Sequence, residues 1–114
     1  MKPKIKKLWI EALTSGEYKQ GKGALNPAKG KFCCLGVLCD LHDKSKKRKK
    51  SNWDEKGNYL GADLILPAEV SDWAGLPSNN PLCGDHVVAE YNDGLGGAPK
   101  KTFKGMAKLI EQYL

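Results

Sequence analysis

The sequence predicts an α+β fold: a single domain over residues 1–114, with about five helices packed around a central helix and two short β-hairpins. Three observations lead to this class. Apolar residues recur every three or four positions in several segments, as in amphipathic helices. Glycine and proline separate those segments, which is typical of turns. At 114 residues, the chain is long enough for one apolar core and too short for two.

The N-terminal segment predicts a first helix over residues 3–15. Its apolar stripe has helical spacing and consists of Ile5, Leu8, Trp9, Ala12 and Leu13. Gly16 follows the last turn and can adopt the positive φ of a helix C-terminal cap. Charged residues interrupt this segment, so it does not have the apolar region of a signal peptide, and we expect a cytoplasmic protein.

The glycine-rich segment that follows predicts a loop and a first hairpin. Residues 18–25 are mostly polar, and "NPAKG" at residues 26–30 is a turn sequence. We expect residues 23–25 to pair with residues 31–33.

The central helix is predicted to begin at Cys34, within "CCLGVLCDL". Cys34, Leu38 and Leu41 lie on one helical face with further apolar residues beside them, so the helix should be buried. Gly36 costs such a helix about 1 kcal/mol relative to alanine. We therefore expect another stretch of backbone to pack against Gly36.

Five further segments are predicted after the central helix. A mobile basic loop at about residues 43–51 leads to a second hairpin over residues 52–60. A short helix begins at Pro67 and ends before Gly75, and a helical stretch over residues 85–93 is capped by Asp85. The last helix is capped by Thr102, and its inner stripe is Phe103, Met106, Ala107, Ile110, Tyr113 and Leu114. Trp9 and Trp73 fall on apolar stripes and are expected in the core.

Composition and charge narrow the function classes. Apolar residues make up 40% and charged residues 28%, and the longest apolar run is far shorter than the roughly 20 residues of a membrane-spanning helix. The net charge of +6 comes from one run, "KSKKRKK", and the rest of the chain is balanced. The positive residues of this run are Lys44, Lys46, Lys47, Arg48, Lys49 and Lys50. It predicts a solvated loop with at most weak, salt-sensitive, non-specific attraction to nucleic acid.

Several motifs, taken together, resemble a family of small proteins encoded by tailed bacteriophages and prophages. They are "WIEALTSGEYKQGKGAL", "FCCLGVLCDL", "LPAEVSDWAGL", "YNDG" and "FKGMAKLIEQYL", in that order. The basic run and the long connection "NDGLGGAPKKTF" depart from the family pattern. The resemblance implies a phage protein that acts in the host cytoplasm during infection. By analogy with compact phage proteins that sequester nucleotide immune signals of the host, it also suggests an anti-defence role.

The cysteines allow three interpretations. Packing of small thiols in a tight helix is favoured for Cys33, Cys34, Cys39 and Cys83, all expected to be reduced in the cytosol. A zinc site would normally need paired C-x2-4-C knuckles presented by turns, whereas Cys33 and Cys34 are adjacent, Cys39 lies inside an apolar helix, and Cys83 is the only long-range partner. A reactive thiolate is best placed at Cys33, at a helix N-terminus, but no spacing links it to His42 or His86 as a base. We therefore assign no catalytic residue, metal ligand or cofactor.

The loop before the cysteines is the stronger candidate for function. Its predicted ligand-binding residues are Tyr18, Lys19, Gln20, Gly21 and Lys22. Glycines let backbone amides approach a ligand, lysines attract phosphate, and glutamine can recognise a base or ribose edge. The alternative is a solvated connecting loop that Tyr18 and Leu25 anchor to the core.

Three residues elsewhere complete the predicted site. Asn92 could donate to a ligand, and Asp93 could hold the Gln20 loop or a lysine, although both residue types are also common turn formers. Trp53, with Tyr59 on the same predicted hairpin, could stack on a base.

These patterns lead to one main functional hypothesis and two alternatives. The main hypothesis is a non-enzymatic, oligomeric protein that captures a phosphorylated small molecule, such as a cyclic or linear nucleotide signal. The first alternative is an inhibitor that blocks a host enzyme through its first or last helix or its basic run. The second is a small nucleotide hydrolase that uses Cys33.

Overall fold

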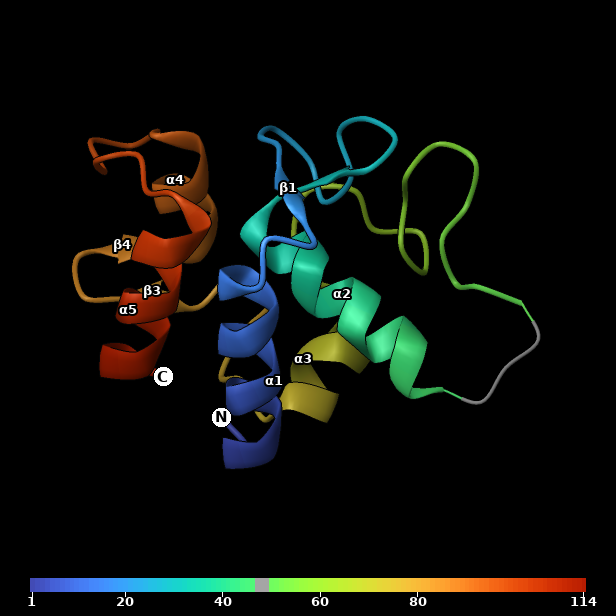
Figure 1. Cartoon of the computed structure of the whole chain (residues 1–114), viewed down its shortest axis with the longest axis horizontal. Coiled ribbons are helices and arrows are strands. Elements are labelled where there is room, and N and C mark those ends of the chain that lie inside the picture. The colour runs from blue at the N-terminus through green and yellow to red at the C-terminus, as the bar shows by residue number, and fades with distance from the viewer. Residues whose placement is uncertain (47–49) are drawn as a thin grey trace.

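The computed structural model describes residues 1–46 and 50–114, and within them it has five helices and two short strand pairs (Figure 1). The elements in chain order are α1 (Pro3–Thr14), β1 (Lys19–Gln20), β2 (Lys31–Phe32), α2 (Cys34–Ser45), α3 (Ala68–Ala74), β3 (Leu82–Cys83), β4 (His86–Val87), α4 (Val88–Asp93) and α5 (Phe103–Tyr113). The predicted α+β class is confirmed.

Helix α2 is the buried centre of the fold, as predicted. Its residues from Cys34 to Cys39 are all buried, and α1, α3, α4 and β2 pack around it. The helix begins where Cys33 adopts an extended conformation and its Sγ accepts the N–H of Gly36. Trp9 of α1 is fully buried and donates its indole N–H to the carbonyl of Cys34 at 3.0 Å. The hydrogen bond lets a large aromatic side chain be buried without an unsatisfied donor.

Gly36 lies where another backbone crosses α2, which confirms the sequence prediction. A Cβ at this position would collide with the carbonyl oxygen of Leu25 and lie 2.8 Å from its carbonyl carbon. The carbonyl of Leu25 also accepts the N–H of Cys33 at 3.1 Å. Glycine is therefore required by the close approach of the loop to α2.

The first and last helices lie side by side and bring the chain ends together (Figure 1). The N-terminal ammonium donates to the carbonyl of Leu114 at 3.4 Å. Helix α5 starts as predicted, with Thr102 Oγ1 accepting the N–H of Gly105, and α3 ends at Gly75, whose φ is 68°. Two stripe predictions are wrong, because Leu8 is 41% exposed and Tyr113 48% exposed.

The first predicted hairpin is wrong. Instead of residues 23–25, strand β1 pairs with β2, in parallel, with Lys19 opposite Lys31 and Gln20 opposite Phe32. In the loop between the two strands, the side-chain amide of Asn26 donates to the carbonyl of Lys31 at 2.6 Å, which joins the loop to the start of β2. Two-residue strands are too short to show an alternating pattern, so the sequence does not reveal this pairing.

The predicted helix over residues 85–93 starts too early. Residues 82–87 form a tight antiparallel hairpin, β3 with β4, in which Gly84 has a φ of 72° and Asp85 lies in the turn. The helix begins only at Val88, and Glu90 Oε1 accepts the N–H of Val87. Asp85 therefore does not cap α4.

The second predicted hairpin forms, and the start predicted for the basic loop is wrong. The N–H of Asp54 donates to Asn58, and the N–H of Leu60 donates to Asn52. Residues 43–45 belong to α2, whereas we expected the loop to start there.

No helix in the described part of the chain is long and apolar enough to cross a membrane.

Candidate functional site

The buried amide of Asn92, in α4, fastens the glycine-rich loop to α2. Its Oδ1 accepts the side-chain N–H of Gln20 and the backbone N–H of Cys34, both at 3.0 Å. Its Nδ2 donates to the carbonyl of Gly21 and to Asp93 Oδ1, both at 2.9 Å. These four bonds match the donors and acceptors of an asparagine amide. Asn92 therefore holds the loop in place, and donation to a ligand would require one of these bonds to open.

Asp93 and Gln20 add to the same attachment. Asp93 Oδ2 accepts the N–H of Gly23 at 3.2 Å, in line with the prediction that Asp93 holds the Gln20 loop. Gln20 Nε2 donates a second bond, at 2.9 Å, to the carbonyl of Lys101. The amide nitrogen of Gln20 is thus used within the protein, while its carbonyl oxygen takes no part in these two bonds.

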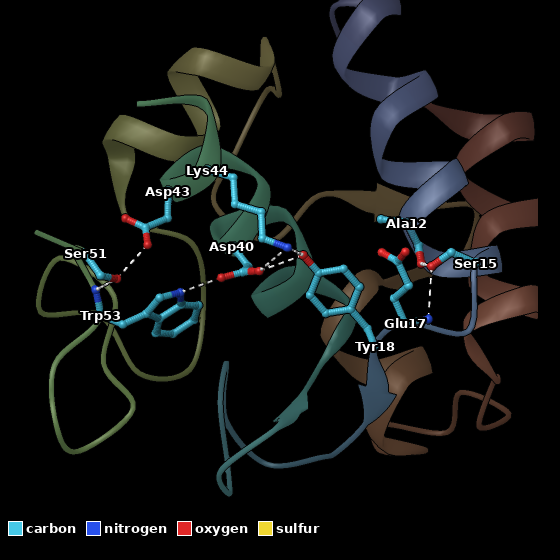
Figure 2. A network of polar contacts seen from close by, with 9 residues as sticks. All are labelled: Ala12, Ser15, Glu17, Tyr18, Asp40, Asp43, Lys44, Ser51 and Trp53. Carbon is cyan, nitrogen blue, oxygen red and sulfur yellow. Dashed lines mark hydrogen bonds and ion pairs between the residues drawn. The ribbon is translucent and has the colours of Figure 1, made fainter. Parts of the chain in front are cut away.

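Tyr18 and Trp53 meet at one carboxylate, that of Asp40 in α2 (Figure 2). The Tyr18 hydroxyl donates to Asp40 Oδ2 at 2.6 Å, and the Trp53 indole N–H donates to Oδ1 at 3.1 Å. Lys44 lies across the pair, 3.3 Å from Asp40 Oδ2 and 3.0 Å from the Tyr18 hydroxyl. Partial burial and donation to Asp40 raise the pKa of Tyr18. Both aromatic residues therefore anchor segments to α2, as the alternative for Tyr18 predicts.

Tyr18 and Trp53 also belong to a series of aromatic rings in contact with one another. Phe32 of β2 lies between Tyr18 and Trp53, with ring centroids 5.4 and 5.7 Å apart. Trp53 continues to Tyr59 at 4.8 Å. Tyr59 is fully buried, and its hydroxyl lies 2.6 Å from His42 Nδ1. Stacking of a base on Tyr59 is therefore contradicted, and Trp53 is half-buried between two rings.

A cationic cleft of about 410 Å³ opens beside the fastened loop. It is lined by Gln20, Gly21, Lys22, Pro27, Ala28, Lys31 and Lys100. Three of the lining residues are lysines, each exposed, and none is acidic. Lys19 does not line the cleft, but its backbone is the register partner of the lining residue Lys31. Like charges on paired residues repel one another, so an anion between them would be stabilising.

The structure brings some of the predicted residues together and separates others. Gln20, Gly21 and Lys22 line the cleft, and Asn92 and Asp93 bond to the loop that forms one of its walls. Tyr18 and Trp53 instead meet at Asp40, which is not a lining residue. Sequence reasoning missed Lys31 and Lys100. Lys31 reaches the cleft through the parallel pairing of β1 with β2, and Lys100 through the path of the connection between α4 and α5. Neither feature has a local sequence signal.

The cysteines form part of the core. Cys33, Cys34, Cys39 and Cys83 are free and buried. Burial raises the pKa of Cys33 and of Cys83 to about 11, and it raises the pKa of Cys34 and Cys39 as well. A thiol with such a pKa is protonated at neutral pH, so the setting of Cys33 does not favour a thiolate nucleophile. In residues 1–46 and 50–114, no three His, Cys, Asp or Glu side chains gather as metal ligands.

The basic run is described only at its ends. Lys44 belongs to the anchor on Asp40, and the backbone N–H of Lys46 donates to Asp43. Ser51 and Asn52 return the chain to Asp43 through bonds of 2.6 and 2.9 Å. The predicted nucleic-acid contacts of Lys47, Arg48 and Lys49 lie outside the described residues.

Comparison with known protein families finds a family that matches the chain. Residues 1–114 match the family described as a domain of unknown function (DUF8296). The chain belongs to this family. No curated protein and no solved structure matches it. Because the match spans the whole chain, the cleft, the fastened loop and α2 are all parts of the DUF8296 domain.

Proposed function

We propose that this protein binds a phosphorylated small molecule in the cationic cleft and sequesters it without chemical change. The observation that carries the proposal is the approach of Lys22, Lys31 and Lys100 to one open cleft whose lining has no carboxylate. Ammonium groups gathered from separate segments create a positive potential that favours phosphate over neutral ligands. The volume of about 410 Å³ falls in the range of small-molecule sites.

The attachment of the loop supports binding rather than a loose surface contact. Asn92 and Asp93 hold the backbone of Gly21 and Gly23, and the carbonyl of Lys101 holds the side chain of Gln20, before any ligand arrives. A preorganised site avoids part of the entropy cost of ordering side chains and backbone on binding. The carbonyl oxygen of Gln20 is the lining acceptor that could select a hydroxyl or an amino group of a nucleotide.

The resemblance to phage proteins directs the choice of ligands. Under this proposal the protein acts in the host cytoplasm as an anti-defence protein, and the ligand is a nucleotide signal made by the host. Sequestration by a homo-oligomer is part of the same proposal, and light scattering coupled to size-exclusion chromatography measures the oligomeric state.

The test is a thermal-shift panel of cyclic dinucleotides, cyclic trinucleotides and ADP-ribose derivatives, followed by titration calorimetry. At a hundred-fold excess over Kd, a ligand should stabilise the protein by about 2.7 kcal/mol, a rise in Tm of roughly 10 °C. Chromatography of the ligand after release should recover it unchanged. Absence of any stabilisation would contradict binding, and a converted ligand would contradict sequestration.

Matched variants locate the site. Replacing Lys22, Lys31 and Lys100 by alanine should weaken binding at least about thirty-fold, because three charge-assisted contacts are lost. Replacing Lys4, Lys29 and Lys56 by alanine removes the same charge from exposed positions outside the cleft lining. This control should bind within about three-fold of the parent protein. Equal losses in both variants would show that only the net charge matters.

A further inference from the structure

Helices α1 and α5 leave an apolar groove along their shared edge. The groove has a volume of about 490 Å³ and is lined by Ile10, Thr14, Lys104, Ala107, Lys108 and Glu111. None of these residues lines the cationic cleft. The lining positions follow helical spacing on each helix, so the groove runs parallel to both axes. Its floor consists of aliphatic groups, including the methylene stems of the lysines.

The groove continues along α1 toward the N-terminus. An adjoining hollow of about 370 Å³ is lined by Pro3, Lys6, Lys7, Ile10, Glu11 and Glu111. The two hollows share Ile10 and Glu111. Together they follow the 12 residues of α1, a length of roughly 18 Å. A groove of this length between two packed helices can accommodate a third helix.

The rim of the groove is predominantly positive. Four lysines line the two hollows, Lys6, Lys7, Lys104 and Lys108, against two carboxylates, Glu11 and Glu111. Lys6 is fixed by donation to the carbonyl of Glu111 at 3.0 Å. A second copy of this chain would bring the same excess of lysines to the contact, and like charges would face each other. The complementary occupant is therefore an acidic segment of a different protein.

We propose that this groove binds an amphipathic helix of a partner protein, with an apolar stripe for the floor and glutamate or aspartate on both flanks for the lysine rim. The apolar stripe would provide most of the affinity by removing the floor from water, while the acidic flanks would select the partner. The proposal does not depend on the function proposed for the cationic cleft.

The test uses two designed peptides of about 16 residues with the same leucine stripe at helical spacing. One has glutamates on both flanks of the stripe and the other has lysines. Fluorescence anisotropy of the labelled peptides should show saturable binding of the glutamate peptide and at least about ten-fold weaker binding of the lysine peptide.

Two charge-reversal variants place the contact. Lys104→Glu with Lys108→Glu changes exposed rim residues of α5, and should weaken the glutamate peptide about ten-fold or more while strengthening the lysine peptide. Lys29→Glu with Lys56→Glu makes the same change of charge outside the groove and should leave both affinities within about three-fold.

Four results would overturn the proposal. They are no saturable binding of the glutamate peptide below about 1 mM, equal binding of the two peptides, an equal loss in both variants, or a homodimer in light scattering that the rim variant abolishes. The last result would assign the groove to a second copy of the chain. Circular dichroism of each variant confirms that a loss of binding is not a loss of fold.

Discussion

At the scale of single residues, Asn92 and Gly36 determine where the glycine-rich loop lies. Asn92 bonds to the loop, to the first turn of α2 and to Asp93, and Gly36 lets the loop backbone cross α2 at Leu25. The first contact depends on the amide nitrogen of Asn92, and the second depends on the absence of a Cβ at Gly36. Substitutions that change only these atoms therefore test them.

Asn92→Asp should destabilise the protein by about 3 kcal/mol although it changes no volume. The new oxygen would face the carbonyl of Gly21 and the carboxylate of Asp93, where the native Nδ2 donates. Asn79→Asp makes the same change at an exposed position and should cost less than about 0.5 kcal/mol. Urea unfolding measures both. Equal midpoints for the two variants would contradict the role given to the amide.

Gly36→Ala should destabilise the protein by about 1 to 3 kcal/mol because the added methyl group meets the Leu25 carbonyl. Gly105 is its matched control. Each glycine is the third residue of its helix and donates its N–H to the capping side chain, Cys33 or Thr102. A Cβ at Gly105 would meet only the flexible side chains of Lys101 and Thr102, at 3.3 Å or more.

Gly105→Ala should therefore be neutral or stabilising by up to about 1 kcal/mol, which is the ordinary effect of alanine in a helix. Thermal and urea unfolding of the two variants measure the difference. If Gly36→Ala were stabilising as well, the close approach of Leu25 to α2 would be refuted.

At the scale of elements, the sequence predicts the helices well and the strand pairs poorly. Helices α1, α2, α3 and α5 have apolar spacing within their own residues, and some have local end signals beside them, such as Gly75 after α3 and Thr102 before α5. The pairing of β1 with β2 depends on contacts with α4, distant in sequence, and β3 and β4 are only two residues long. The candidate site follows the same rule: the loop was predictable, but Lys31 and Lys100 join it only through tertiary structure.

The buried thiol of Cys33, the N-cap of α2, predicts a loss of stability at alkaline pH. Burial raises the pKa of Cys33 to about 11 in the folded protein, above its ordinary value of 9.0 in the unfolded chain. The protonated thiol therefore stabilises the fold fully below about pH 9, and this contribution is lost as the pH rises to about 11. The slope is about 1.4 kcal/mol per pH unit for each thiol that stays protonated only in the folded state.

Urea unfolding in the presence of reductant at pH 7, 8, 9 and 10 measures this slope. Cys33→Ser keeps an acceptor for the N–H of Gly36 and removes the titrating thiol. Between pH 9 and 10 the variant should lose about 1 kcal/mol less stability than the parent, because the unfolded thiol is only partly ionised at pH 9. A parent protein whose stability does not change between pH 8 and 10 would contradict the burial of the thiols.

At the scale of the whole molecule, the supporting residues and the proposed binding surfaces depend on one buried helix. The face of α2 with Asp40 anchors Tyr18 and Trp53, its first turn bonds to Asn92, and its side chains meet α1, α3 and α4. The loop of the cationic cleft and the helix α1 of the groove are thus both seated on α2. The most stable part of the domain should consequently be its centre, not its termini.

Native-state hydrogen exchange should find the slowest amides in α2, at buried residues such as Val37 and Leu38. Their opening free energy should equal the global unfolding free energy from urea, because exposing them requires all the surrounding helices to separate. The amides of β3 and β4, in a short hairpin with an exposed Leu82, should open at a free energy at least about 2 kcal/mol lower. If α2 opened below the global free energy while α1 and α5 stayed protected, the loop and its cleft would fold as a unit separate from the two terminal helices.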